Sequence, residues 1–292
     1  MKTSTCRFLC PLLFTLSFAY AIAAQQDLTD KSAPVSVEMP FRLGSGYLIV
    51  VEGRVGDLTG LKFILDTGTS TSFLDTHVAS KLRLKRRANS VINFGKTVPV
   101  ESSAIPNVQF GPVQAKNVEM YIGDLGKFSD FAIGIDAIIG LDLLQQNNLT
   151  LDYKAHKVVF DHINHTNRGT AARLENGWYL TVDLLVQDHP LHLILDTGVE
   201  GIILFEDRVR AKVPGLRMGN VIEGVTIGRR INAKEATVPG MSLGPVKVDG
   251  RVLLLKGRSE NKLDGIDGFL GVASFRAERI SLNFATKMIS WE

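Results

Sequence analysis

The chain has 292 residues, with 33 basic and 30 acidic side chains and a formal net charge of +3. A balance this close to neutral gives no electrostatic reason to expect a nucleic-acid partner. Both cysteines, Cys6 and Cys10, lie close to the N-terminus. The rest of the chain therefore cannot form a disulfide, a zinc thiolate site or a cysteine nucleophile.

Residues 1–24 are typical of a secretory signal peptide. Lys2 and Arg7 lie at the start, an apolar stretch covers 8–18, and small residues follow at 19–24. Such an apolar stretch is short for a membrane span. We therefore expect cleavage and export to a periplasm or to the extracellular space, with no stable membrane association afterwards. Retention of the segment as a membrane anchor is the alternative.

The remaining sequence consists mostly of short apolar or alternating runs separated by Gly, Pro and Asn, a pattern typical of an all-β protein. In chain order, the clearest predicted strands are Tyr47–Glu52, Leu61–Leu65, Val118–Ile122, Lys157–Phe160, Trp178–Leu185 and Val252–Leu255. Only a few short helices are predicted, at Asp75–Leu84, Leu141–Gln145 and Phe205–Lys212.

Several segments recur in the same order about 131 positions later. The triplet Asp66–Gly68 returns as Asp196–Gly198, each time as Asp-Thr-Gly after an apolar run. Three further segments recur at this spacing: Gly46-Tyr47 with Gly177-Trp178, Asp136–Gly140 with Asp267–Gly271, and Leu149–Tyr153 with Ile280–Phe284. An ordered series of this kind indicates an internal duplication. We expect an N-terminal lobe at 25–165 and a C-terminal lobe at 166–292.

The repeated carboxylate suggests a specific chemistry. Two carboxyl groups held close together cannot both ionise easily, so they share one proton. One can then take a proton from water while the other donates a proton to a carbonyl oxygen. The sequence therefore predicts Asp66 and Asp196 as the catalytic pair of an enzyme that hydrolyses peptide bonds.

The residues after each Asp are expected to support the two loops. Gly68 and Gly198 allow close backbone approach, and their amides can donate to the carboxylates. The hydroxyl groups of Thr67 and Thr197 are placed to bond to the backbone of the other half. Thr69 adds a hydroxyl to the first loop only.

These paired triplets, with the apolar-apolar-Gly segments at Ile138–Gly140 and Phe269–Gly271, resemble the pepsin-like and retropepsin-like aspartic peptidases. The resemblance is closest to exported bacterial members with lobes of retropepsin size, and it covers essentially the whole chain after the signal. It implies a bilobal pepsin-like architecture of two duplicated β-barrel lobes, with one catalytic Asp in each. It also implies a polypeptide substrate and no metal or organic cofactor.

Peptidases of this kind close a β-hairpin flap over the substrate. The distance after each Asp places the candidate flap and substrate-binding residues at Phe94 and Gly95 in the first half, and at Ile227 and Gly228 in the second. Ordinary hairpin turns at these positions are the alternative.

The two loops differ after the triplet, because Thr69-Ser70 in the first corresponds to Val199-Glu200 in the second. Val199 offers no hydroxyl to the neighbouring carboxylate, and the Glu200 charge lies nearby, so we expect a raised apparent pKa for the pair. The difference motivates a second hypothesis, a catalytically silent peptide-binding or inhibitory module with the peptidase fold. A monomer is expected, and a lobe-exchanged dimer is the alternative.

Overall fold

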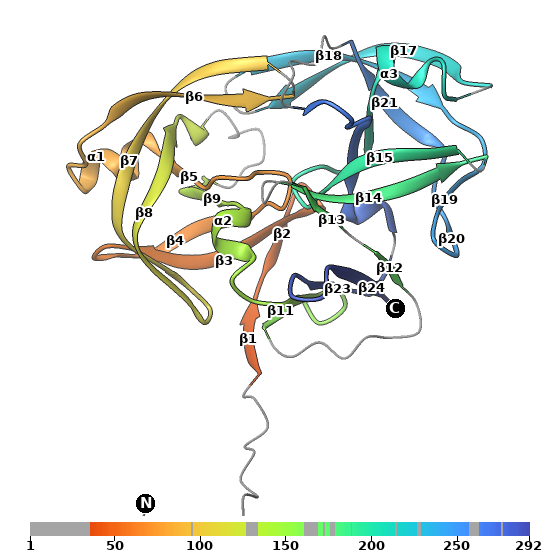
Figure 1. Cartoon of the computed structure of the whole chain (residues 1–292). Coiled ribbons are helices and arrows are strands. Elements are labelled where there is room, and N and C mark those ends of the chain that lie inside the picture. The colour runs from red at the N-terminus through yellow and green to blue at the C-terminus, as the bar shows by residue number, and fades with distance from the viewer. Residues whose placement is uncertain are drawn as a thin grey trace, which may run out of the picture. The chain divides into compact units, whose positions relative to one another are not determined.

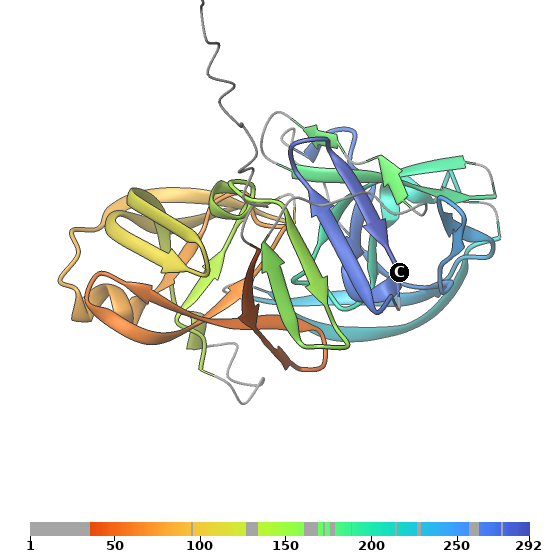
Figure 2. The same ribbon diagram turned by 90° about the horizontal axis from the view of Figure 1, so that it is seen from below.

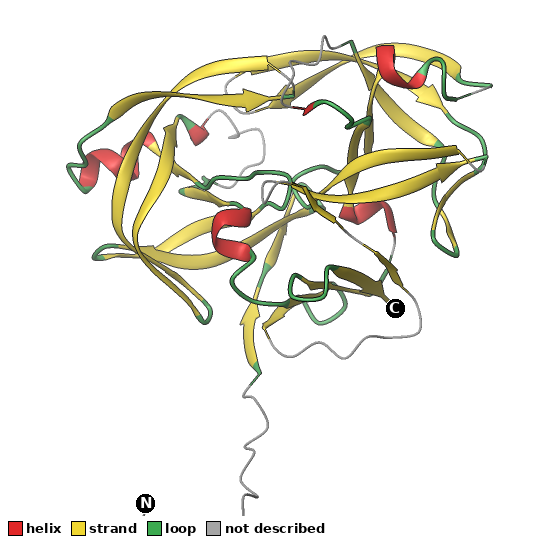
Figure 3. Cartoon of the chain, viewed as in Figure 1, coloured by secondary structure: helices red, strands yellow, loops and turns green. Residues whose placement is uncertain are grey.

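The computed structural model describes residues 36–94, 96–126, 134–160, 169–171, 173–175, 179–187, 189–213, 215–226, 229–256, 263–275 and 277–292. It is mostly β-strand, with three short α-helices in these residues (Figures 1 and 3). The prediction of a mostly β chain with few short helices is confirmed. The predicted signal peptide and the predicted lobe boundary at 165–166 lie outside the described residues. None of the described helices has the length and apolarity needed to cross a membrane.

The first half of the chain forms a sheet of eight strands. In spatial order they are β2 (Arg42–Gly44), β3 (Leu48–Val55), β4 (Leu58–Leu65), β9 (Ala137–Ile139), β5 (Phe73–Asp75), β8 (Val113–Gly123), β7 (Lys96–Phe110) and β6 (Arg87–Asn93). Strand β3 also pairs with β7, so the sheet curls back on itself. Phe63 and Phe110 pack edge-to-face in the core that this curled sheet encloses.

The second half forms a sheet of ten strands. The path runs β17 (Arg217–Thr226), β18 (Arg229–Thr237), β21 (Arg251–Leu255), β16 (Ile202–Phe205), β22 (Gly268–Gly271), β15 (His189–Asp196), β14 (Tyr179–Val186), β19 (Met241–Leu243) and β20 (Val246–Lys247), with β13 (Arg173–Glu175) beside β14. Strands β15, β16 and β22 are largely buried apolar runs, as expected for central strands covered on both faces.

A third sheet combines strands from both halves and faces the viewer in Figure 2. Its order is β1 (Val37–Pro40), β11 (Lys157–Phe160), β10 (Leu149–Asp152), β23 (Arg279–Asn283), β24 (Met288–Trp291) and β12 (Gly169–Ala171). At its centre β10 and β23 pair antiparallel, with the hydroxyl groups of Thr150 and Ser281 2.8 Å apart. Because these residues are equivalent in the repeat, the register is that of two copies of one strand paired about a local two-fold axis.

The strand pairing of the first half recurs in the second. Strand β4 runs parallel to β9 and β15 runs parallel to β22. The antiparallel pair β5–β9 recurs as β16–β22, and the hairpin β6–β7 recurs as β17–β18. The sequence repeat is therefore also a repeat of strand pairing.

The helices are shorter than predicted. The predicted helix Asp75–Leu84 is α1 (Thr76–Lys81), because the Asp75 side chain acts as N-cap and Leu82 is the C-cap. The second is α2 (Leu141–Leu144), close to the prediction. The third, α3 (Glu206–Val209), covers only part of the predicted range, since the amide of Lys212 donates to the carbonyl of Val209 in a tighter turn.

Candidate active site

The two Asp-Thr-Gly turns lie against each other. Asp66 directly follows β4, and its amide donates to the carbonyl of Ile139 at 2.9 Å. Asp196 is the last residue of β15 and lies opposite Gly271 of β22. Each Asp is thus held at the end of a buried strand by a neighbouring parallel strand, β9 or β22. These are the segments that the sequence predicted as partners of the two loops.

Reciprocal hydrogen bonds through Thr67 and Thr197 join the two turns. The Thr67 hydroxyl donates to the carbonyl of Leu195 at 2.8 Å, and the Thr197 hydroxyl donates to the carbonyl of Leu65 at 2.7 Å. Each hydroxyl also accepts the amide of the opposite Thr, at 3.0 and 3.1 Å. Both side chains are buried. The expected hydroxyl bonds between the halves are therefore present, and they fix one turn against the other.

Both turns require glycine because each glycine lies very close to the carboxyl group of the opposite turn. A Cβ on Gly68 would lie 2.2 Å from the Oδ2 atom of Asp196, and one on Gly198 would lie 2.9 Å from the Oδ2 atom of Asp66. Each glycine amide also donates to the carboxylate of its own turn, Gly68 at 2.9 Å and Gly198 at 2.6 Å. The turns can approach this closely only because neither glycine carries a side chain.

The side chains of Asp66 and Asp196 are hydrogen-bonded to each other. Burial raises the pKa of Asp66, while the Thr69 hydroxyl, which donates at 2.9 Å, opposes that rise. Burial and then the charge of Asp66 raise the pKa of Asp196 well above its ordinary range. Val199 offers Asp196 no side-chain donor equivalent to Thr69. The pair therefore retains a proton at pH values where ordinary carboxyl groups are ionised.

The acid pair opens onto a cavity of about 1610 Å³ that is lined by both halves of the chain. Phe94 lies at the tip of the β6–β7 hairpin, where Asn93 pairs with Lys96. Its ring packs on Phe269 of the second half, with centroids 4.8 Å apart. The hairpin tip therefore reaches a wall formed by the other half. The other candidate flap residues, Gly95, Ile227 and Gly228, lie outside the described residues.

Tyr47 is a cavity residue that the sequence did not single out, except as the start of a repeated strand. It lines the cavity beside the acid pair. Burial, and then the charges of Glu200, Asp196 and Asp66, raise the pKa of Tyr47 to about 12. Its hydroxyl group therefore remains protonated and can donate a hydrogen bond within the site.

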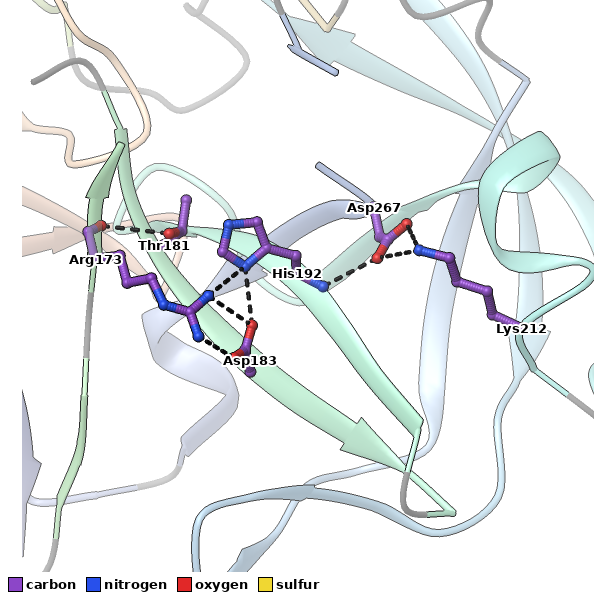
Figure 4. Close-up of polar contacts among 6 residues, drawn as sticks. All are labelled: Arg173, Thr181, Asp183, His192, Lys212 and Asp267. Atoms are coloured by element: carbon purple, nitrogen blue, oxygen red, sulfur yellow. Dashed lines mark hydrogen bonds and ion pairs between the residues drawn. The ribbon is translucent and has the colours of Figure 1, made fainter. Parts of the chain in front are cut away.

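A buried carboxylate, Asp267, holds β22 beside the second turn (Figure 4). It accepts the amide of His192 at 3.0 Å and the Lys212 ammonium group at 2.6 Å. The His192 ring in turn contacts Asp183, which also binds Arg173 at 2.6 Å. Although burial raises the pKa of Asp183, these two partners lower it below its ordinary value. His192, to which the sequence assigned no role, thus belongs to the support of the Asp196 strand.

The first half has an equivalent carboxylate, Asp136, ahead of β9. It accepts the amide of Lys62 at 2.8 Å, as Asp267 accepts that of His192. Its second partner is a histidine in place of a lysine, because Nε2 of His77 lies 3.1 Å from Asp136, while Nδ1 contacts Asp75. The sequence contained Asp136 and Asp267 within a recurring segment, but gave no signal of the partner on each side.

Within the described part of the chain, no group of three His, Cys, Asp or Glu side chains is arranged to hold a metal ion.

Residues 51–143 match the aspartyl protease family. The matched range includes Asp66, the β6–β7 hairpin and the Ile138–Gly140 segment, and it ends before the second triplet. The match indicates an aspartyl protease domain in the first half and suggests peptidase activity. No curated protein matches the chain.

Proposed function

We propose that the chain is an aspartic endopeptidase that uses Asp66 and Asp196. In this mechanism the ionised carboxylate takes a proton from a water molecule, whose oxygen attacks the scissile carbonyl carbon. The protonated carboxyl group donates its proton to the carbonyl oxygen. The carboxyl group that took the proton from water then passes it to the amide nitrogen, the other carboxylate takes back a proton from a hydroxyl group of the tetrahedral intermediate, and the C–N bond breaks. The observation that supports this proposal best is the hydrogen-bonded acid pair, which has a raised pKa and faces a large cavity.

We further propose that the chain has a bilobal pepsin-like architecture, with lobes at 25–165 and 166–292. The recurring strand pairs and the reciprocal bonds of Thr67 and Thr197 support it. So does the central pairing of β10 with β23. In this arrangement each lobe supplies one Asp, and the candidate flap hairpins extend over the cavity.

The test of the mechanism is cleavage of a fluorogenic peptide library from acid to neutral pH by the wild type and by Asp66→Asn and Asp196→Asn. Each variant should lose at least about a thousandfold in turnover, because the amide can neither carry nor accept the shared proton. Asp152→Asn, a change at a partly exposed carboxylate that pairs with Arg279, serves as the matched control and should cleave normally. Retained turnover in either active-site variant would exclude this mechanism.

A catalytically silent peptide-binding or inhibitory module is the second candidate, and Val199 is the observation that favours it. Asp66 accepts the hydroxyl group of Thr69, but Asp196 has no such donor because Val199 stands at the equivalent position. The ionised pair is therefore less stabilised, and it holds the shared proton more tightly. Measurable peptide binding without cleavage across the same library and pH range would support this candidate over the enzyme.

We also propose export after cleavage of residues 1–24, and a monomeric state. N-terminal sequencing of the protein from the cells that produce it tests the first proposal, and a retained Met1 in the membrane fraction would contradict it. Light scattering of the active protein tests the second. A mass of two chains, with activity lost on dilution, would instead indicate the lobe-exchanged dimer.

A further inference from the structure

Glu200 is a carboxylate on the loop of Asp196 that has no cationic partner among the described residues. It follows Asp196 by four residues, is exposed and lines the cavity. No basic side chain among the described residues forms an ion pair with it. Tyr47, Asp66 and Asp196 line the same cavity as Glu200.

Most of the other acidic residues at the cavity wall have a partner. Glu101 is paired with Arg86 at 3.2 Å, and Asp249 is paired with Arg251 at 3.0 Å. Asp124 has a partner of its own, whereas Glu235 on β18 forms no ion pair within the described residues. Among the described residues outside the acid pair, Glu200 and Glu235 are therefore the carboxylates of the cavity wall without an ion pair, and Glu200 is the one on the loop that carries Asp196.

This charge is present on one side of the pair only. The position equivalent to Glu200 in the first loop is Ser70, which also lines the cavity and is neutral. The duplicated loops are otherwise closely alike, so the charge breaks the symmetry of the cavity. A polypeptide bound across the pair would meet a carboxylate on one side of its scissile bond and a hydroxyl on the other.

We propose that Glu200 and Tyr47 form a subsite for a Lys or Arg side chain of the polypeptide substrate, on one side only of the cleaved bond. The inference rests on the proposed peptidase function. The cationic group pairs with Glu200, and its apolar stem packs along the half-buried ring of Tyr47. An acidic side chain at the same position is repelled.

The test uses the wild-type protein and a peptide library to find the substrate position that responds to charge. Matched peptides then carry Lys, norleucine or Glu at that position. We expect kcat/KM for Lys to exceed that for norleucine by about threefold to tenfold, with Glu the poorest, because the pair forms at a partly exposed site. The Lys preference should weaken as salt is added. A substitution in the protein that only disturbed folding would lower kcat/KM for all three peptides alike.

Three variants locate the effect. Glu200→Gln should abolish the difference between Lys and norleucine, whereas Glu235→Gln should preserve it. Ser70→Glu should add a second preference for a basic residue on the opposite side of the cleaved bond. Equal rates for Lys and norleucine in the wild type, or a preference that survives in Glu200→Gln, would overturn the proposal.

A binding measurement separates this inference from the proposed function. The same peptides, fluorescently labelled, are bound to the wild type and to Glu200→Gln and followed by anisotropy. A Lys preference in binding that depends on Glu200, without cleavage, would contradict the peptidase and support the subsite. Neither cleavage nor preference would contradict both, and cleavage without preference would contradict the subsite alone.

Discussion

The reciprocal threonine bonds lead to the most quantitative prediction. Thr67→Val keeps the shape of the side chain but removes its hydroxyl. The carbonyl of Leu195 then loses a donor at 2.8 Å, and the amide of Thr197 loses an acceptor at 3.1 Å. Both groups lie at a buried contact between the two halves, where no water replaces the lost partner.

The size of the effect follows from these two groups. Leaving a buried backbone donor or acceptor without a partner costs about 1–3 kcal/mol. With two such groups, Thr67→Val should therefore lower the free energy of unfolding by about 2–6 kcal/mol. Thr197→Val should do the same, because Leu65 and Thr67 lose the corresponding partners. Both variants should also lower kcat/KM at temperatures where they remain folded, because the two Asp-bearing turns are no longer held together.

Urea denaturation and peptide cleavage on the same samples provide the assay. Thr150→Val is the matched control, since its hydroxyl also bonds across the halves, to Ser281, but lies in the third sheet rather than in the Asp-bearing turns. It should cost about 0.5–1.5 kcal/mol and leave kcat/KM unchanged. A Thr67→Val protein as stable and as active as the control would refute the role assigned to these bonds.

Three further predictions concern the charges around the pair. Val199→Thr should give Asp196 a hydroxyl donor, which favours its ionised form and lowers its pKa, so the alkaline limb of the pH profile of kcat/KM should move to lower pH. Because the folded state binds the proton of Asp196 more tightly than the unfolded state, stability should fall as pH rises from the ordinary carboxyl range through the raised pKa. Asp196→Asn should remove that dependence in urea denaturation measured against pH, and an unchanged slope would contradict the raised pKa. Lys212→Met should lower the free energy of unfolding by about 1–3 kcal/mol, because buried Asp267 loses a hydrogen-bonded cation. Lys154→Met, which breaks an exposed pair, should leave it nearly unchanged.

The mostly β fold was predictable because strand signals are local. The alternation and apolar runs around Leu61–Leu65 and Val252–Leu255 require only neighbouring residues to be recognised, and both are strands in the structure. Helix ends were less predictable. The predicted helix Phe205–Lys212 contracted to α3, because a tight turn that no periodicity signals ends it at Val209.

The meeting of Asp66 and Asp196 could also be anticipated, although they are far apart in the chain. A duplicated sequence that folds into equivalent halves can bring equivalent residues together near a two-fold axis. The same reasoning predicted the bonds of Thr67 and Thr197 to the opposite backbone. In this respect the internal repeat carried long-range information that a single copy would have lacked.

Only the tertiary structure determined which side chains contact the equivalent residues of the two halves. The sequence repeat gave Asp136 and Asp267 equivalent places, but the choice of His77 on one side and Lys212 on the other depends on helices that are not alike. The cavity likewise brings together Tyr47 and Glu200, which come from different halves. Residue type and local periodicity thus determined the strands and the acid pair. The partners of each carboxylate were set by contacts distant in sequence, which depend on how the halves pack.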